Sequence, residues 1–204
     1  MGFYSQAVFP RFYDCLMDKP FWAKYRREQL SSVEGEILEI GVGTGLNLPH
    51  YPEHVQRIVT VDPNPGMNKR LQRRAEKCGI EVDQRVLGSE SLPFEDGTFD
   101  FVVSTITLCS IRNVQQAMAE LCRVLKRGGR IVFLEHGLSP DPNVAKWQRR
   151  LNGFQRLFAD GCTLTLNVPE LLFTQPFRSV EIDSFYMDET PKTYGYMYRG
   201  TATK

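Results

Sequence analysis

Glycines at alternate positions, followed one strand later by an aspartate, are the residues of this sequence whose types and spacing best suit binding chemistry. Gly41, Gly43 and Gly45 leave an apolar run and form a turn, where larger side chains would keep a ligand away from the backbone. Asp62 ends the next apolar run, where a carboxylate can accept hydrogen bonds from both hydroxyls of a ribose. Glu39 precedes the turn and favours a ligand with an ammonium beside a sulfonium. The pattern therefore predicts a site for an adenosyl sulfonium.

Two other interpretations of this turn stay open. A nicotinamide-dependent oxidoreductase also combines a glycine-rich turn with a distant acid, but its Gly-x-Gly-x-x-Gly fingerprint meets Leu46 at the third position. A pyrophosphate would be repelled by Glu39, and the sequence shows no evident motif for a proton donor. A tight turn that binds no ligand is the remaining alternative, and the presence of Asp62 argues against it.

Four further side chains could act on a second substrate. His136 and Asp160 are candidates for a general base, if that substrate must lose a proton. Each also has a structural interpretation, because His136 can bond a turn and Asp160 stands before a glycine, where it can cap one. Cys109 and Cys162 suit small buried side chains better than nucleophiles, since transfer from a sulfonium needs no covalent step on the protein.

The elements that must position these residues alternate along the chain. Apolar runs at 37–40, 58–61, 101–103 and 131–134 read as strands, and helical patterns cover 66–78 and 114–125 between them. Lys126, Arg127 and two glycines then suit a helix C-terminus. Two late runs, 180–186 and 194–201, could pair as an antiparallel edge. We predict an α/β fold, a Rossmann-like, seven-stranded and mainly parallel sheet with an antiparallel C-terminal strand.

We expect one domain, residues 1–204, with three parts. Residues 1–34 carry aromatic and apolar side chains at helical spacing, interrupted near Pro10 and Pro20, and form a helical lid. Residues 35–135 form the cofactor-binding core, and residues 136–204 hold an insert on the substrate side and the last strands. The basic stretch from Lys146 to Arg156 suits a solvated helix face or a surface that touches lipid head groups.

Composition excludes several classes of protein. Twenty-five basic against 24 acidic residues leave no electrostatic footprint for nucleic acid. The five cysteines are scattered, without a CxxC pair or histidines at metal spacing, so we expect reduced thiols, a cytoplasmic location and no metal site. No apolar run approaches the roughly 18 residues of a membrane span. The partner is then a small molecule, and the oligomeric state stays open.

Five motifs in their family order carry a resemblance to a known family. They are Glu39-Ile-Gly-Val-Gly-Thr-Gly45, Val61-Asp62-Pro63, Leu92-Pro93-Phe94, Phe99-Asp-Phe-Val-Val-Ser104 and Leu125-Lys-Arg-Gly-Gly-Arg-Ile131. The sequence resembles the class I S-adenosylmethionine-dependent methyltransferases, which implies S-adenosyl-L-methionine as cofactor. Narrower strings around Cys109, His136 and Cys162 are similar to the methyltransferase-like thiol methyltransferase group. Ubiquinone-type and phospholipid methyltransferases are similar to a smaller extent.

The resemblance also implies roles for individual residues. Gly41, Gly43 and Gly45 would surround the methionyl and ribose parts, with Asp62 on the ribose hydroxyls. Where many relatives have an acid for the adenine amino group, this chain has Gly88. The remaining cofactor candidates, bordering the adenine or lying beneath the sulfonium, are Pro63, Met67, Ser89, Glu90, Ser104 and Thr105.

The methyl acceptor implied by the resemblance is a small hydrophobic molecule, with a thiol preferred. A phospholipid amine or a quinone-like carbon acceptor is an alternative, and so is a noncatalytic protein that only binds the cofactor. A thiol with a pKa of about 8.5 is partly thiolate at neutral pH and needs a weak base or none. An ammonium or phenol with a pKa of about 10 needs more help, which His136 or Asp160 would have to give.

Overall fold

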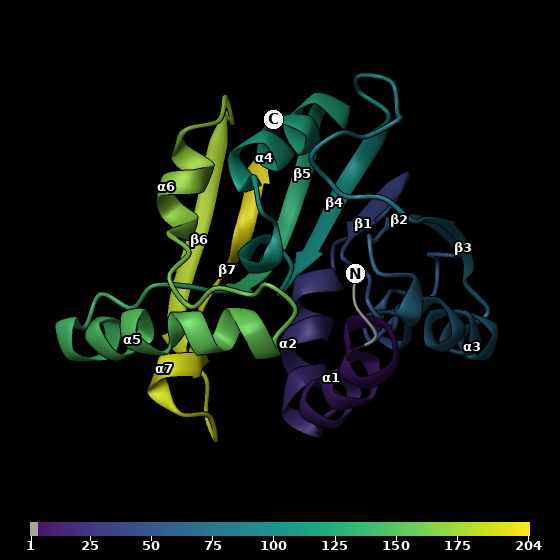
Figure 1. Cartoon of the computed structure of the whole chain (residues 1–204). Coiled ribbons are helices and arrows are strands. Elements are labelled where there is room, and N and C mark those ends of the chain that lie inside the picture. Colours follow the sequence, from purple (N-terminus) through teal and green to yellow (C-terminus); the bar gives the residue numbers. More distant parts are fainter. Residues whose placement is uncertain (1–3) are drawn as a thin grey trace.

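Residues 4–204 are described by the computed structural model, and they form one seven-stranded sheet (Figure 1). The strand order is β3-β2-β1-β4-β5-β7-β6. The first five strands run parallel, and β7 is antiparallel to both β5 and β6. The strands are β1 Ile37–Ile40, β2 Arg57–Val61, β3 Glu81–Arg85, β4 Phe99–Thr105, β5 Leu125–His136, β6 Ser179–Tyr186 and β7 Tyr196–Thr203. The predicted fold class is confirmed.

Helices cover both faces of this sheet and also gather at the carboxyl ends of its parallel strands. In Figure 1, α4 lies beside β5 and α6 beside β6, α3 flanks β3, and α1, α2 and α5 gather at the end of the sheet to which β4 points. The helices are α1 Phe9–Met17, α2 Pro20–Leu30, α3 Asn68–Cys78, α4 Val114–Val124, α5 Pro142–Phe158, α6 Val168–Phe173 and α7 Lys192–Gly195. Among the helices of residues 4–204, none combines the length and the hydrophobicity that a bilayer crossing requires.

The core lies on both sides of the central strands. Val102 of β4 packs into a cluster with side chains of α4 and α6, whereas Phe101 and Val103 pack into a second cluster with side chains of α2 and α3. Adjacent side chains of a strand point to opposite faces, so a strand buried on both faces reads as a continuous apolar run. That property explains why the central strands could be predicted from the sequence.

Three details differ from the sequence-based expectation. Strand β3 has the polar sequence Glu-Val-Asp-Gln-Arg and pairs with β2 only. It therefore has no apolar run from which it could be predicted. The predicted antiparallel pair of late strands exists, but β7 lies inside the sheet and β6 forms its edge. Helix α4 ends at Val124, and the basic pair and glycines after it belong to a bulge at the start of β5 rather than to a helix terminus.

The N-terminal helices lie across the carboxyl ends of the parallel strands, as the predicted lid requires (Figure 1). The first three residues of that lid lie outside the described residues. A π-helical turn, η1 (Tyr4–Val8), leads into α1, so Pro10 falls in the first turn of a helix, where proline is tolerated. The predicted break at Pro20 is confirmed, since Pro20 begins α2. This arrangement brings the N-terminal segment over the glycine turn.

Candidate functional site

The glycine turn follows β1 and leads into the 3₁₀ helix η2 (Leu48–His50), ahead of β2. Gly41, Gly43 and Gly45 have φ angles of 59°, 54° and 81°, a region that side chains disfavour. A Cβ on Gly41 would lie 2.3 Å from the Thr107 side chain, so this position also needs glycine for space. The carboxylate of Asp62 accepts from Gly43 N at 2.9 Å. We call Gly41–Gly45 together with Asp62 the cofactor turn.

Asp62 joins two successive loops at this edge of the sheet. Its second oxygen accepts from Asn64 N at 2.8 Å, so each carboxylate oxygen uses one acceptor position on a backbone amide. Burial raises the pKa of Asp62, and the two amides oppose the rise. A carboxylate has about four acceptor positions, so two stay free for the hydroxyls of a ribose. The predicted pairing of turn and acid is therefore present in the geometry.

Glu39 is buried beneath the cofactor turn and is fully engaged by neighbouring side chains. It accepts from Asn47 Nδ2 at 2.8 Å and from the Tyr51 hydroxyl at 2.9 Å. Burial raises the pKa of Glu39 to about 7, and these two hydrogen bonds limit the rise. Asn47 in turn accepts from Arg26 Nε of α2, which ties the N-terminal helices to the base of the site. Glu39 supports the turn and adds negative charge beneath it.

Ser104 and Thr105, at the end of β4, are buried and bonded to different partners. Ser104 donates to Glu135 at 2.6 Å. Thr105 accepts from Asn47 at 2.9 Å and donates to Gln29 of α2 at 2.9 Å. Because their polar atoms are engaged with the protein, their side chains fix the floor of the site.

The candidates for the adenine side follow two neighbouring strands. Val61 pairs with Arg85, so the segments after β2 and β3 leave the sheet side by side. Met67 and Ser89 are buried in these segments, while Pro63 is exposed and Glu90 half-buried. The Glu90 carboxylate lies 2.6 Å from the point where a Cβ on Gly88 would stand. Glu90 thereby brings a carboxylate to the place of the acid that the sequence lacks at position 88.

The N-terminal segment lies directly on the cofactor turn. Tyr13 of α1 lies 3.7 Å from the place of a Cβ on Gly43. Burial raises the pKa of Tyr13, with Arg26 opposing the rise and both Asp62 and Cys109 adding to it. The Tyr13 ring therefore lies beside the cofactor turn. It is a residue of the site that the sequence analysis assigned only to a helical lid.

An ion-pair cluster holds α1 in this place. Asp14 accepts from the Thr44 hydroxyl in the cofactor turn and from Arg70 Nη1 of α3 at 2.7 Å. Arg74 Nη1 lies 3.3 Å from Asp14 and donates to Thr44 O at 2.8 Å. Asp14 is half-buried, which strengthens such pairs relative to exposed ones. The cluster fastens the N-terminal helix to the turn and to the helix that follows β2.

Glu135, next to the last residue of β5, shapes the loop after β4. Its buried carboxylate accepts from Thr107 N at 3.0 Å and from Leu108 N at 3.2 Å. Burial raises the pKa of Glu135 to about 6, opposed by these bonds and by Ser104. Ile106 in this loop has a φ of 52°, a strained conformation for a β-branched residue. The strained turn directs the chain into the 3₁₀ helix η4 (Leu108–Ser110), which carries Cys109.

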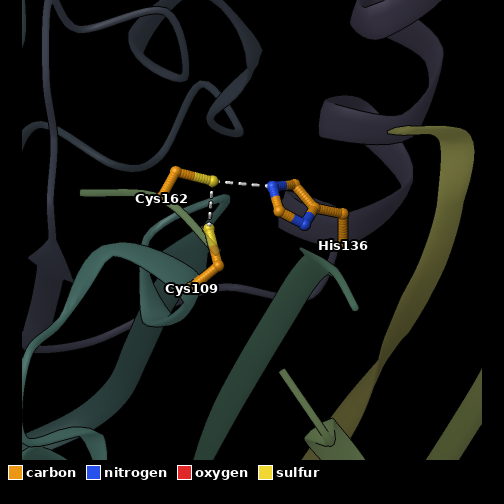
Figure 2. A group of neighbouring side chains, drawn as sticks. All are labelled: Cys109, His136 and Cys162. Carbon is orange, nitrogen blue, oxygen red and sulfur yellow. Dashed lines mark hydrogen bonds between the residues drawn. The ribbon is translucent and has the colours of Figure 1, made fainter. Parts of the chain in front are cut away.

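Cys109, His136 and Cys162 meet at the carboxyl ends of β4 and β5, where their side chains point toward one another (Figure 2). Cys109 Sγ lies 3.1 Å from Cys162 Sγ, which lies 2.8 Å from His136 Nε2. We call these three residues the acceptor end. Burial alone lowers the pKa of His136, but Cys162 and Glu135 outweigh burial and leave that pKa raised. The sequence analysis expected no metal site, yet the fold brings together three buried groups that could bind a metal.

Asp160 lies in the loop after α5 and points to the N-terminal segment. Its Oδ2 accepts from the Ser5 hydroxyl at 2.8 Å and from Asn64 Nδ2 at 3.2 Å. Asn64 also bonds Ser5 O, so these three residues join the N-terminal segment, the loop after β2 and the loop before Cys162. This placement favours the structural interpretation of Asp160 over that of a free base.

Some residues of the site could not be found from local patterns. Asn47, Asn64 and Glu135 act through hydrogen bonds to partners that are distant in sequence. Cys109 and Cys162 are 53 positions apart, and the sequence analysis interpreted them as separate buried thiols. The one signal was that Cys109, His136 and Cys162 all fall within the narrow strings of the family resemblance.

Comparisons with known proteins agree with this geometry. A family model described as a methyltransferase domain matches residues 38–133. The thiol S-methyltransferase TMT1A of Homo sapiens is 32% identical over 169 residues, which cover 78% of this chain and 69% of that protein. The phosphatidylethanolamine N-methyltransferase of Cereibacter sphaeroides is 31% identical over 123 residues, 59% of this chain and 60% of that protein. The chain spans 62 to 69% of the length of four curated thiol S-methyltransferases.

A solved structure supports the fold independently. It is a S-adenosylmethionine-dependent methyltransferase of Thermotoga maritima, described as a possible histamine N-methyltransferase. It superposes with a TM-score of 0.69 at 18% identity and covers 97% of this chain and 98% of its own. At this identity the likeness shows a shared fold and says nothing of a shared acceptor.

Proposed function

We propose that this chain, which belongs to the class I S-adenosylmethionine-dependent methyltransferases, methylates a small hydrophobic thiol. The family itself excludes the nicotinamide-dependent oxidoreductase that the glycine turn had left open. In the proposed complex, Gly41, Gly43 and Gly45 approach the methionyl and ribose parts of the cofactor, and Asp62 accepts from the ribose hydroxyls. Glu39 favours the positive charge of the ligand from beneath the turn.

The observation that carries the thiol assignment is that both carboxylates near the acceptor end, and Nε2 of His136, are already engaged with protein groups. Nε2 of His136 lies against Cys162, Glu135 accepts from three donors, and Asp160 accepts from two. An acceptor with a pKa of about 10 would need one of these groups to take its proton, whereas a thiol with a pKa of about 8.5 does not. The similarity to curated thiol S-methyltransferases points to the same acceptor.

The transfer itself needs alignment more than acid–base chemistry. The thiolate sulfur forms a bond to the methyl carbon while the bond from that carbon to the sulfonium breaks, and the electron pair stays on the departing sulfur. The acceptor proton goes to solvent before transfer. Ser104, Thr105 and Glu135 fix the floor on which the reacting groups meet, and Tyr13 closes the site from above. In this assignment Asp160 holds the N-terminal segment and does not move a proton.

A panel of acceptors with labelled adenosylmethionine tests the proposal. We expect methyl thioether products from small apolar thiols and rates at least about tenfold lower with matched amines and phenols, because these remain protonated at neutral pH. Phosphatidylethanolamine vesicles belong to the panel, since one relative is named for that substrate. Preferred methylation of the amine or the lipid would replace the thiol assignment, and binding without any turnover would favour the noncatalytic alternative.

A further inference from the structure

The acceptor end contains two thiols and an imidazole in a buried cluster. Ligand atoms of Cys109, His136 and Cys162 lie within 4.8 Å of one another, and the three residues are 2%, 7% and 5% exposed (Figure 2). Cysteine sulfur and histidine nitrogen are the groups that zinc and other thiophilic divalent cations prefer. Catalytic zinc sites commonly have three protein ligands and leave the fourth position open. The composition of the cluster therefore matches an open zinc-type site.

Several independent contacts hold the ligands in place. The strained turn at Ile106 and the two backbone bonds of Glu135 fix the segment that carries Cys109. Thr163 donates to Cys109 O with both its backbone N at 2.9 Å and its hydroxyl at 3.1 Å, which fastens the loop of Cys162 onto that segment. His136 ends β5, whose backbone is paired on both sides. The cluster is built by three separate parts of the fold.

Two of the three ligand pairs lie close to the distances of a tetrahedral site but are shorter, and the third lies within 4.8 Å. With metal–sulfur bonds of about 2.3 Å and metal–nitrogen bonds of about 2.0 Å, sulfur atoms lie about 3.8 Å apart and sulfur and nitrogen about 3.5 Å apart. The structure has 3.1 Å between the two sulfurs and 2.8 Å between Cys162 Sγ and His136 Nε2. An opening of roughly 0.7 Å in each of these two pairs would bring them to tetrahedral distances. Rotation of the two short cysteine side chains supplies such a movement.

Charge gives a further reason for a cation. Two neighbouring buried thiols cannot both ionise without a counter-charge. A divalent cation on two thiolates and a neutral imidazole leaves the cluster without net charge. His136 Nδ1, which has no partner within residues 4–204, then carries the ring proton.

We propose that Cys109 Sγ, Cys162 Sγ and His136 Nε2 bind one thiophilic divalent cation of the zinc class, with the fourth position open to the sulfur of the methyl acceptor. Metal binding goes beyond the proposed function, whereas the role in acceptor binding rests on it. The acceptor thiol loses its proton to solvent when its sulfur binds the cation. That sulfur then forms the bond to the methyl group, the sulfonium bond breaks toward the cofactor sulfur, and the neutral thioether leaves because it is a weaker ligand.

The site is tested first without any acceptor. Metal-free protein, kept under reducing conditions, is titrated with Co²⁺, and purified protein from zinc-supplemented cells is analysed for metal. We expect about one equivalent of metal per chain and the near-ultraviolet absorption of a cobalt–thiolate bond. Cys109→Ser, Cys162→Ser and His136→Asn should each weaken binding at least about tenfold, while Cys122→Ser, which removes another buried thiol, should not. Unchanged binding in the ligand variants, or no thiolate band, would overturn the site.

Folding of the variants and the state of the thiols are controlled separately. Calorimetry with adenosylmethionine shows whether each variant keeps an intact cofactor turn. A disulfide between Cys109 and Cys162 that mass spectrometry finds in fully reduced buffer would also overturn the proposal, since it removes both sulfur ligands.

The role in acceptor binding has its own readout. Adding a small apolar thiol to the cobalt-loaded protein should change the cobalt spectrum, and a matched amine should not. An unchanged spectrum together with full thiol methylation by metal-free protein would overturn the activating role. Absence of thiol methylation by zinc-loaded protein that does bind metal would contradict the proposed function and leave the metal site supported. The two failures are therefore distinguishable.

Discussion

The cofactor turn and the acceptor end lie at the same edge of the sheet but are assembled differently. The cofactor turn takes its shape from glycine backbone angles and from Asp62, one strand away. The acceptor end collects Cys109, His136 and Cys162 from a short 3₁₀ helix, a strand end and a loop after α5. Local chain geometry therefore shapes the proposed cofactor site, while long-range packing assembles the cluster proposed to meet the acceptor.

The largest effect that this comparison predicts concerns Gly41. Gly41→Ala places a side chain at a φ of 59° and within 2.3 Å of Thr107, so we expect the free energy of unfolding to fall by about 3 to 4 kcal/mol. Gly79→Ala is the matched control, because its φ is 68° and nothing lies within 4 Å. It should cost about 1 kcal/mol. Equal losses in urea denaturation would show that close packing at the turn is unimportant.

Next in size is the pH dependence that Glu39 confers on the ligand-free protein. Its pKa is raised from 4.5 to about 7 in the fold, so the folded state holds a proton that the unfolded state has lost between these values. Stability should therefore fall as pH rises from about 4.5 to 7, by about 3 kcal/mol in total. Glu39→Gln should flatten this part of the profile, and Glu53→Gln, an exposed control, should not. Denaturant midpoints of the parent protein and both variants, measured across this pH range, test the prediction. The same slope in all three would contradict it.

Asp62→Asn tests whether adenosylmethionine affinity depends on the cofactor turn and not on the acceptor end. Loss of the charge on the ribose partner should weaken adenosylmethionine binding about ten- to hundredfold, while the backbone bonds of the turn can partly persist. Cys162→Ser, at the acceptor end, should change that affinity by less than about twofold. Calorimetry on both variants is the measurement. If the Cys162 variant loses as much affinity as the Asp62 variant, the two parts do not act separately.

The smallest expected effect concerns the fastening of the N-terminal helix. Asp14→Asn weakens the bonds to Arg70 and Arg74, each worth about 1 kcal/mol or less, so adenosylmethionine should dissociate a few times faster. Asp18→Asn is the control, because within residues 4–204 the Asp18 side chain forms an ion pair with Arg74 alone, and it is 63% exposed. Stopped-flow displacement gives the rates. Identical rates in both variants and the parent protein would mean that α1 does not restrain the cofactor.

The parts of the fold that could be predicted from the sequence are those determined by interactions between residues close together in the chain. Strands buried on both faces appear as apolar runs, and the cofactor turn appears as glycines that precede an acid. Strand β3 was missed because its edge position leaves its side chains polar. The end of α4 was misplaced because Gly128, with a φ of 79°, serves a bulge in β5 and not a helix cap.

The acceptor end was only partly predictable for a different reason. His136 was identified because it ends a clear apolar run, but its partners Cys109 and Cys162 carry no local signal for a shared site. Their contact depends on the strained turn at Ile106 and on the bonds from Thr163, which no short pattern in the sequence encodes. Asp160 was identified as a candidate, yet its bond to Ser5 could be known only from the fold.

The tight packing of the N-terminal segment has a consequence for the rate of turnover. A Cβ on Gly66 would lie 2.2 Å from Gln6 O, and Tyr13 lies against Gly43, so this segment packs on both the loop after β2 and the cofactor turn. We expect the spent cofactor to leave only after the segment lifts. We expect the residence time of that product, rather than the chemical step, to limit turnover, which a burst in the first cycle would reveal.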